Sequence, residues 1–261
     1  MKKFLGICFS AVVLASVAAS GAACAPSGGK TLYVYTESGF APYEYLSDSG
    51  KVVGVDIDIM NAIGKELGYE VVVNDVAFDA IPSYVQGNKN AVAAAGMTKK
   101  ADRDEIMAAS VSYATSVQYV ISATALATDD NNKVSVAALA GKKIGTQVGT
   151  TGFYLIDDEI NLEDGSLNGT GASVLEYKNA VVAKTDLGST IDAIVIDKLP
   201  ALSLTLKTSY YCYELDEEPE SYVLYLNKDN GELLTAVNEV LTAMIADGKI
   251  EEFTINHSTG K

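Results

Sequence analysis

The stretch VDIDIMNAIGKELGYEVVVN, residues 55–74, decides the fold of this 261-residue chain. Its first part places an apolar residue at every fourth position: Val55, Ile59, Ile63 and Leu67. That spacing predicts a helix, and Gly68 suits its end because glycine readily adopts the left-handed C-cap conformation. Residues 70–74 carry three consecutive valines and predict a buried strand. A helix that leads straight into a buried strand is typical of a parallel α/β sheet.

The same alternation continues on both sides of this stretch. In the first half, strands are expected at residues 32–36, 70–74 and 91–95, with helices at 55–67 and 78–86. In the second half, strands are expected at residues 142–146, 173–176, 191–196 and 220–227, with helices at 152–158, 179–187, 197–205 and 233–245. Residues 159–171 are rich in Gly and Asn, which predicts a surface loop. The chain therefore holds two α/β units.

Bulk composition excludes several classes of protein. The formal net charge of −15 would repel phosphate backbones, so no nucleic-acid partner is expected. Cys8, Cys24 and Cys212 form no disulfide framework. His257 is the single histidine and stands alone near the C-terminus, so we expect no metal site and no cofactor.

The N-terminus has the pattern of an export signal. Two lysines, an apolar run and a zone of small residues make residues 1–23 a signal peptide. The segment GAAC at 21–24 resembles a bacterial lipoprotein box, with Cys24 as the acylated residue, although Gly21 replaces the usual aliphatic residue. Residues 24–30 would then tether the protein to the outer face of the membrane. The alternative is a soluble secreted protein cut near Ala23.

Polar groups gather where the expected strands end, which is where ligands sit in open α/β sheets. Arg103 is a planar cation that can donate two parallel hydrogen bonds to a carboxylate. The helix that opens after Gly149 offers amides to an anion, and Asp197 suits an ammonium group. An α-amino acid carries both charges, so the set is complementary to it. The further candidates from this survey are Glu37, Phe40, Tyr43, Gly96, Met97, Thr98, Gln147, Thr150 and Thr151.

Six motifs, in order, carry a family resemblance: FAPYEY at 40–45, VGVDID at 53–58, FDAIP at 78–82, GMT at 96–98 with Arg103, GKKIG running into QVGTT at 141–151, and DAIVID at 192–197. Their order and spacing resemble the extracytoplasmic solute-binding proteins of family 3, the amino-acid receptors of ABC importers. The resemblance covers residues 31 to about 253. It implies an α/β protein with the two-lobed periplasmic-binding-protein fold of type II, each lobe a mixed sheet with flanking helices.

The resemblance also implies roles and boundaries. Lobe 1 would hold residues 31–112 plus 223–261, lobe 2 residues 119–217, and hinge strands residues 113–118 and 218–222. Arg103 and Thr98 would bind the ligand carboxylate from lobe 1. Thr151, with Thr150 beside it, would bind it from lobe 2, and Asp197 would bind the ammonium. Side chains expected to flank the ligand are Phe40, Tyr43 and Phe78, with Glu37 facing its side chain.

Simpler roles compete for some of these residues. Asp197 suits the N-cap of the helix that follows it, and Thr150 and Thr151 suit the same position in theirs. Packing or solvation is the simpler role for four others: Phe40, Phe78, Tyr43 and Glu37.

The expected function is capture of a polar or basic amino acid by hinge closure. Its partners would be the membrane permease and ATPase of an ABC importer, and the protein would be a monomer. No nucleophile–base pair is recognisable, so we expect no enzyme. Two alternatives stay open: a sensory ligand-binding protein, and a dehydratase on the same fold with Glu37 as its spare carboxylate.

Overall fold

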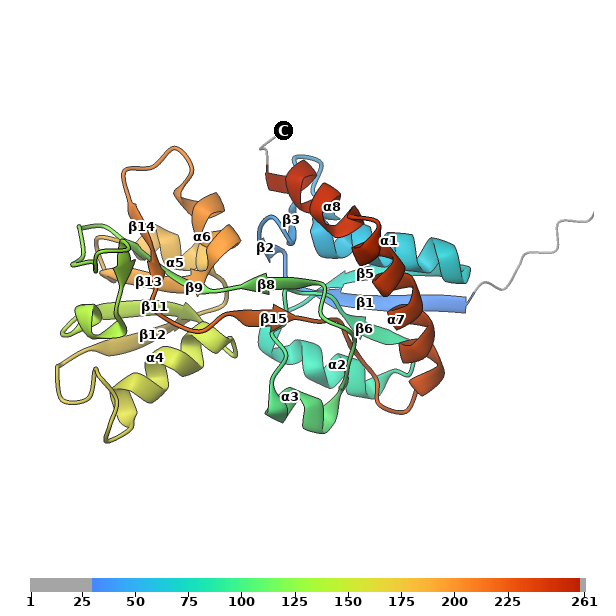
Figure 1. Ribbon diagram of the computed structural model, residues 1–261, viewed down its shortest axis with the longest axis horizontal. Coiled ribbons are helices and arrows are strands. Elements are labelled where there is room, and N and C mark those ends of the chain that lie inside the picture. Colours follow the sequence, from blue (N-terminus) through green and yellow to red (C-terminus); the bar gives the residue numbers. More distant parts are fainter. Residues whose placement is uncertain (1–29, 259–261) are drawn as a thin grey trace, which may run out of the picture.

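Two α/β lobes joined by two neighbouring strands make up residues 30–258, the part of the chain that the computed structural model describes (Figure 1). The expected signal peptide, the acylated Cys24 and the tether up to Gly29 lie outside the described residues. Within residues 30–258, no helix is long and apolar enough to cross a bilayer.

Lobe 1 is built on a five-stranded sheet in the order β5-β1-β6-β16-β7. Its strands are β1 (Lys30–Thr36), β5 (Tyr69–Asp75), β6 (Ala91–Ala93), β7 (Ala108–Ala109) and β16 (Tyr225–Leu226). The first three are mutually parallel, and β16 runs antiparallel to both of its neighbours. The helices of this lobe are α1 (Val55–Leu67), η1 (Phe78–Ala80), α2 (Ile81–Gly87), α3 (Ala101–Ile106), α7 (Gly231–Ala246) and α8 (Lys249–Ser258).

Helix α1 and strand β5 form as residues 55–74 predict. Val55, Ile59 and Ile63 are fully buried against the sheet. The helix ends at Gly68, whose φ of 71° is left-handed and whose N–H donates to the carbonyl of Gly64. In β6, Val92 packs into one core of lobe 1 and Ala91 and Ala93 pack into the other, because successive side chains of a strand point to opposite faces of the sheet.

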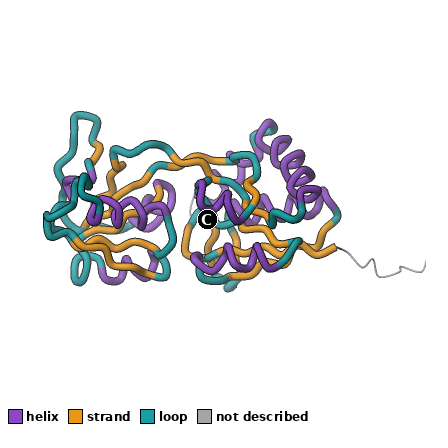
Figure 2. Tube along the Cα trace, turned by 90° about the horizontal axis from the view of Figure 1, so that it is seen from below, coloured by secondary structure: helices purple, strands orange, loops and turns teal. Residues whose placement is uncertain are grey.

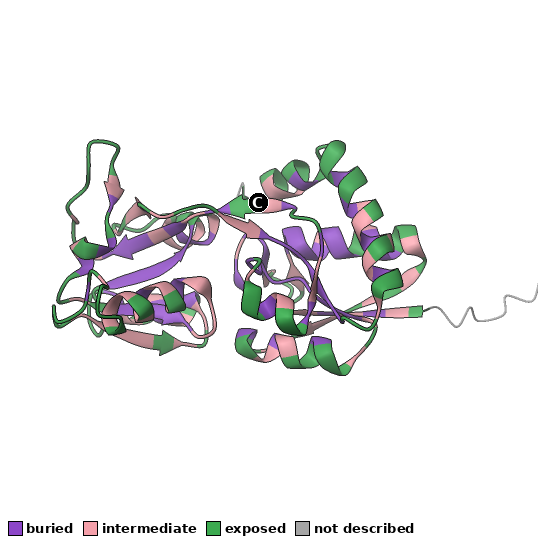
Figure 3. Cartoon of the chain, turned by 60° about the horizontal axis from the view of Figure 1, so that its bottom comes forward, coloured by how far each residue is buried: buried purple, intermediate pink, exposed green. Residues whose placement is uncertain are grey.

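Lobe 2 is built on a six-stranded sheet in the order β10-β14-β9-β13-β11-β12. Its strands are β9 (Gln118–Ser122), β10 (Lys133–Val134), β11 (Lys143–Gln147), β12 (Ser173–Tyr177), β13 (Ala193–Asp197) and β14 (Tyr211–Leu215). Its helices are η2 (Val136–Leu139), α4 (Thr151–Asn161), α5 (Ala180–Asp186) and α6 (Lys198–Thr205). The central strands of both sheets are mostly buried, while the covering helices expose their outer faces (Figure 3).

Strands β8 (Ala114–Ser116) and β15 (Glu220–Tyr222) pair antiparallel and pass between the lobes, as the views from two directions show (Figures 1 and 2). A small sheet of β2 (Gly39–Phe40), β3 (Glu44–Leu46) and β4 (Val52–Val53) lies beside them in lobe 1. This arrangement brings the ends of β1 and β6 to face the ends of β11 and β13.

Some local expectations were wrong. The single strand expected at 220–227 is two strands in different sheets, because Val223 and Leu224 carry the chain from the crossing pair into lobe 1. The loop expected at 159–171 begins only after Asn161, and its Leu167 is buried in the lobe 2 core, so this segment is partly structural. Helix α8 was not expected, because Ile250 is its one buried residue and its apolar signal is weak.

Candidate functional site

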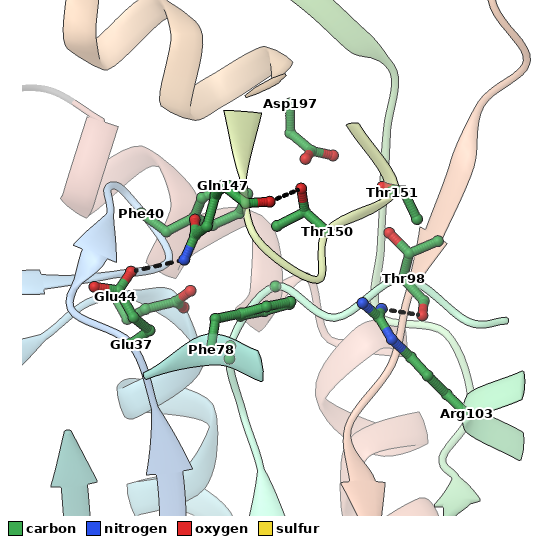
Figure 4. A pocket seen from close by; sticks show the side chains of 12 residues that line it. Glu37, Phe40, Glu44, Phe78, Thr98, Arg103, Gln147, Thr150, Thr151 and Asp197 are labelled. Atoms are coloured by element: carbon green, nitrogen blue, oxygen red, sulfur yellow. Dashed lines mark hydrogen bonds between the residues drawn. The ribbon is translucent and has the colours of Figure 1, made fainter. Parts of the chain in front are cut away.

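A narrow cavity lies between the lobes, where strands of both sheets end (Figure 4). The free space left inside is about 20 Å³, roughly that of one water molecule, so the lobes lie close together and their side chains nearly fill the cavity. Its lining residues are Glu37, Phe40, Glu44, Phe78, Ala95, Gly96, Thr98, Arg103, Gln147, Thr150, Thr151 and Asp197. Of the residues expected at the site, the structure brings all but Tyr43 and Met97 to this wall.

Arg103 is a buried cation without a paired anion. It stands on α3 and is 7% exposed. One guanidinium nitrogen donates to the carbonyl of Thr98 at 2.8 Å, and the other donates across the lobes to the carbonyl of Gly149 at 3.1 Å. None of the ion pairs found within residues 30–258 involves Arg103. Burial lowers its pKa, so an anion that enters the cavity would relieve a real desolvation cost.

Phe78 holds the guanidinium group from one side. Its ring centroid lies 5.5 Å from the Arg103 Cζ, which is within the range of a cation–π contact. Phe78 itself follows β5 and opens η1, so a lobe 1 strand end positions the ring. The remaining guanidinium donors point towards the cavity, and Figure 4 shows Arg103 below it and Asp197 above it.

Asp197 offers the opposite charge from lobe 2. It ends β13 and occupies the N-cap of α6, yet its side chain makes no cap hydrogen bond. One of its buried oxygens, Oδ1, makes no hydrogen bond to any of the described residues 30–258. Burial raises the pKa of Asp197 to about 7 and the charge of Glu220 adds to this effect, while the nearby polar side chains of Tyr222, Ser116 and Gln118 act to lower it. The capping role considered from sequence therefore does not occupy this carboxylate.

Glu37 joins the two lobes. Its Oε1 accepts a hydrogen bond from Asn179 at 2.9 Å, and its Oε2 accepts one from Gln147 at 3.3 Å (Figure 4). Both partners belong to lobe 2, whereas Glu37 follows β1 in lobe 1. Burial raises its pKa. The solvated role considered from sequence is wrong, because only 8% of this residue is exposed.

Glu44 is a second acid at the same end of the cavity. It begins β3 and is almost completely buried, and within the described part of the chain its Oε2 has no hydrogen-bond partner. Burial raises its pKa well above the ordinary range, and the charges of Asp56 and Glu37 act in the same direction. No group of three or more His, Cys, Asp or Glu within residues 30–258 is placed to hold a metal ion. Glu37 and Glu44 both line the cavity.

Of the three threonines in the wall, Thr150 has a different role from Thr98 and Thr151. Thr150 caps α4: its hydroxyl accepts from the Phe153 amide at 3.2 Å and donates to the Gln147 carbonyl at 2.7 Å. The hydroxyls of Thr98 and Thr151 instead share one acceptor, a carboxylate oxygen of Glu220. The simpler N-cap role is thus filled by Thr150, and Thr151 begins the helix proper.

Aromatic and glycine residues shape the wall. Phe40 is mostly buried and lies against Gly96, whose φ of +52° is left-handed. A Cβ at Gly96 would come within 2.6 Å of the Phe40 ring. Tyr43 packs behind the wall, edge to face with Tyr222 at a centroid distance of 5.0 Å, and Met97 is buried in the lobe 1 core.

Sequence reasoning missed three residues of this region: Glu44, Asn179 and Glu220. Glu44 carried a usable signal, since an acid stands inside the apolar FAPYEY motif. Asn179 and Glu220 carried none, because their partners lie 142 and 122 positions away in the chain.

The chain belongs to the bacterial extracellular solute-binding proteins, family 3, whose family model matches residues 32–257. The L-cystine-binding protein TcyJ of Escherichia coli K12 is 28% identical over 228 residues, which are 85% of this chain and 80% of that protein. The ABC transporter arginine-binding protein 1 of the same strain is 25% identical over 220 residues, 82% of this chain and 85% of its own length.

A solved structure shares the architecture. An ancestral arginine-binding protein bound to arginine matches with a TM-score of 0.75 at 29% identity, covering 87% of this chain and 97% of that one. The family and the two-lobed fold expected from the motifs are therefore confirmed.

Proposed function

We propose that this protein captures a free α-amino acid in the cavity between its lobes and delivers it to an ABC-type importer. One observation carries the proposal: a buried, unpaired cation and a buried, unpartnered carboxylate oxygen line the same cavity from opposite lobes. Arg103 supplies the first and Asp197 the second. Buried charges of both signs need counter-charges, and a zwitterion supplies both at once.

Each end of the ligand backbone has its own partners. The α-carboxylate lies against Arg103 and the amino end of α4, whose first-turn amides and helix dipole favour an anion. The α-ammonium donates to Asp197. Phe40 and Phe78 cover the ligand on its apolar faces, as their place in the wall supports.

The side-chain end of the cavity favours a basic ligand. Glu37 and Glu44 line it together, and both have pKa values raised by burial. A cationic side chain would offset the cost of ionising these acids, whereas an aliphatic side chain would leave them unpartnered. Two of the relatives compared are arginine-binding proteins by name, which makes L-arginine the first ligand to test.

Hinge closure couples binding to recognition by the importer. Ligand contacts come from both lobes, so the closed form gains interactions that an open form lacks, and this difference shifts the equilibrium. Strands β8 and β15 are the connections about which the lobes would turn. The protein acts outside the cytoplasm as a monomer, held to the membrane through an acylated Cys24.

A thermal-shift screen of the common amino acids, followed by calorimetry, tests this function. A ligand at 100 times its Kd raises the unfolding free energy by about 2.7 kcal/mol, which is readily measured. L-arginine is expected to bind saturably and to be recovered unchanged. Conversion of the ligand would favour the dehydratase alternative, and absence of a shift with every amino acid would contradict the proposal.

A further inference from the structure

Glu220 connects the lobes at the hinge in a way the proposed function does not use. It begins the crossing strand β15, and its Oε2 accepts a hydrogen bond from Thr98 at 2.6 Å and from Thr151 at 2.8 Å. Thr98 belongs to lobe 1 and Thr151 to lobe 2. A single carboxylate oxygen therefore ties both lobes together.

These two hydroxyls line the ligand cavity. A hydroxyl has only one proton to donate, and here both protons point to Glu220. Towards the cavity each oxygen can offer only lone pairs, which repel a carboxylate. An α-carboxylate held by Arg103 gains hydrogen bonds from Thr98 and Thr151 only if both hydroxyls turn away from Glu220.

We propose that Glu220 is an internal latch that occupies the two hydroxyls of the carboxylate subsite, holds the empty protein closed, and is displaced by the ligand carboxylate. The inference rests on the proposed function only for the identity of the displacing group. The latch itself rests on the two short hydrogen bonds and on the position of Glu220 in a strand between the lobes.

The charges around Glu220 support a competition between Glu220 and the ligand carboxylate for the same subsite. Glu220 is close enough to Asp197 for its charge to raise the pKa of that carboxyl, and close enough to Arg103 to stabilise the guanidinium cation. Glu220 thus acts on Arg103 as a ligand carboxylate does. Gln118 donates to the other oxygen of Glu220 at 3.4 Å, so Gln118 can still donate to Glu220 after the two hydroxyls turn away.

A different role makes the opposite prediction. If Glu220 only positioned Thr98 and Thr151 for the ligand, its removal would weaken binding. If it is a latch, its removal strengthens binding for two reasons: a closed form that excludes ligand becomes less populated, and a like charge beside the carboxylate subsite is gone.

The test compares Glu220→Ala with Glu218→Ala, which removes an equal charge from an exposed residue two positions earlier. Small-angle X-ray scattering of ligand-free protein reports closure, and calorimetry with L-arginine reports affinity. We expect the ligand-free wild type and Glu218→Ala to scatter as the closed form and Glu220→Ala to expand. We also expect Glu220→Ala to bind L-arginine on the order of tenfold more tightly, which corresponds to about 1.4 kcal/mol.

Three results would overturn the latch: an open ligand-free wild type, unchanged scattering in Glu220→Ala, or weaker binding in that variant. Glu220→Gln keeps the shape of the side chain without its charge, and its expected values lie between those of wild type and Glu220→Ala. Scattering needs no ligand, so a wild type that binds none of the common amino acids would contradict the proposed function, while scattering would still decide whether the latch exists.

Discussion

Lowering the pH from 8 to 6 should weaken amino-acid binding about tenfold, because it protonates Asp197. Burial raises the pKa of this carboxyl to about 7 in the ligand-free protein. The ionised form pairs with an ammonium group, and the protonated form does not. With a pKa of about 7, roughly nine-tenths of the sites are ionised at pH 8 and roughly one-tenth at pH 6. The resulting loss is about 1.4 kcal/mol of binding free energy.

Calorimetry with L-arginine at pH 6, 7 and 8 measures this loss. At pH 6 the complex must release nearly one proton from Asp197, so the heat of binding should depend on the ionisation enthalpy of the buffer. Affinity should rise with pH through 7 and level off above it. Glu37 and Glu44 also have raised pKa values and contribute with the same sign.

Asp197→Asn separates the contributions. It should bind more weakly than wild type at pH 8. The number of protons released on binding should fall by about one, and only the protons released by Glu37 and Glu44 should remain. An affinity that is constant from pH 6 to pH 8, or an Asn variant with the same pH dependence as wild type, would refute the reasoning.

Three further predictions concern single residues. Ligand-free Asp197→Asn should be more stable than wild type at pH 8, by about 1.4 kcal/mol for each unit by which the pKa of Asp197 is raised. The reason is that a folded protein with a raised carboxyl pKa loses stability as the pH rises from about 4 to about 7. Urea unfolding should show a smaller gain at pH 5 than at pH 8, and an equal gain at both would count against this prediction. Glu44→Gln should weaken L-arginine by about 1.5–3 kcal/mol and L-glutamine far less, since only the cationic side chain needs the ionised acid; calorimetry with equal losses for both ligands would exclude this role. Gly96→Ala should cost about 1–3 kcal/mol of unfolding free energy, because the new Cβ meets the Phe40 ring at 2.6 Å in a backbone with positive φ; urea unfolding that matches wild type would contradict this packing.

Local patterns predicted the framework well. Helix α1 begins and ends where the apolar spacing and Gly68 indicate, and the parallel β1, β5 and β6 lie where short apolar runs were recognised. What failed was any feature set by distant partners. The division of residues 220–227 between two sheets depends on where β8 and β6 lie, and no periodicity within those eight residues records it.

In the candidate site, too, features set locally were predicted and features set by distant partners were not. Strand ends identified Arg103 and Asp197, because the end of a parallel strand is a position that sequence alone can locate. The state of each side chain was not accessible in this way. That Thr150 caps α4 while Thr151 donates to Glu220 is decided by three-dimensional neighbours, and two adjacent threonines look alike in sequence.

Calorimetry of Arg103→Ala with L-arginine tests the central claim most directly. Removing a desolvated cation from a charge-assisted contact should cost about 2–5 kcal/mol, a loss of roughly 30-fold to several thousand-fold in affinity. Lys99→Ala is the matched control, since it removes a nearby cation that pairs with Asp104 outside the cavity lining. We predict that Arg103→Ala stays folded by circular dichroism and loses binding while Lys99→Ala retains it. A folded Arg103→Ala that binds L-arginine as tightly as wild type would contradict the account.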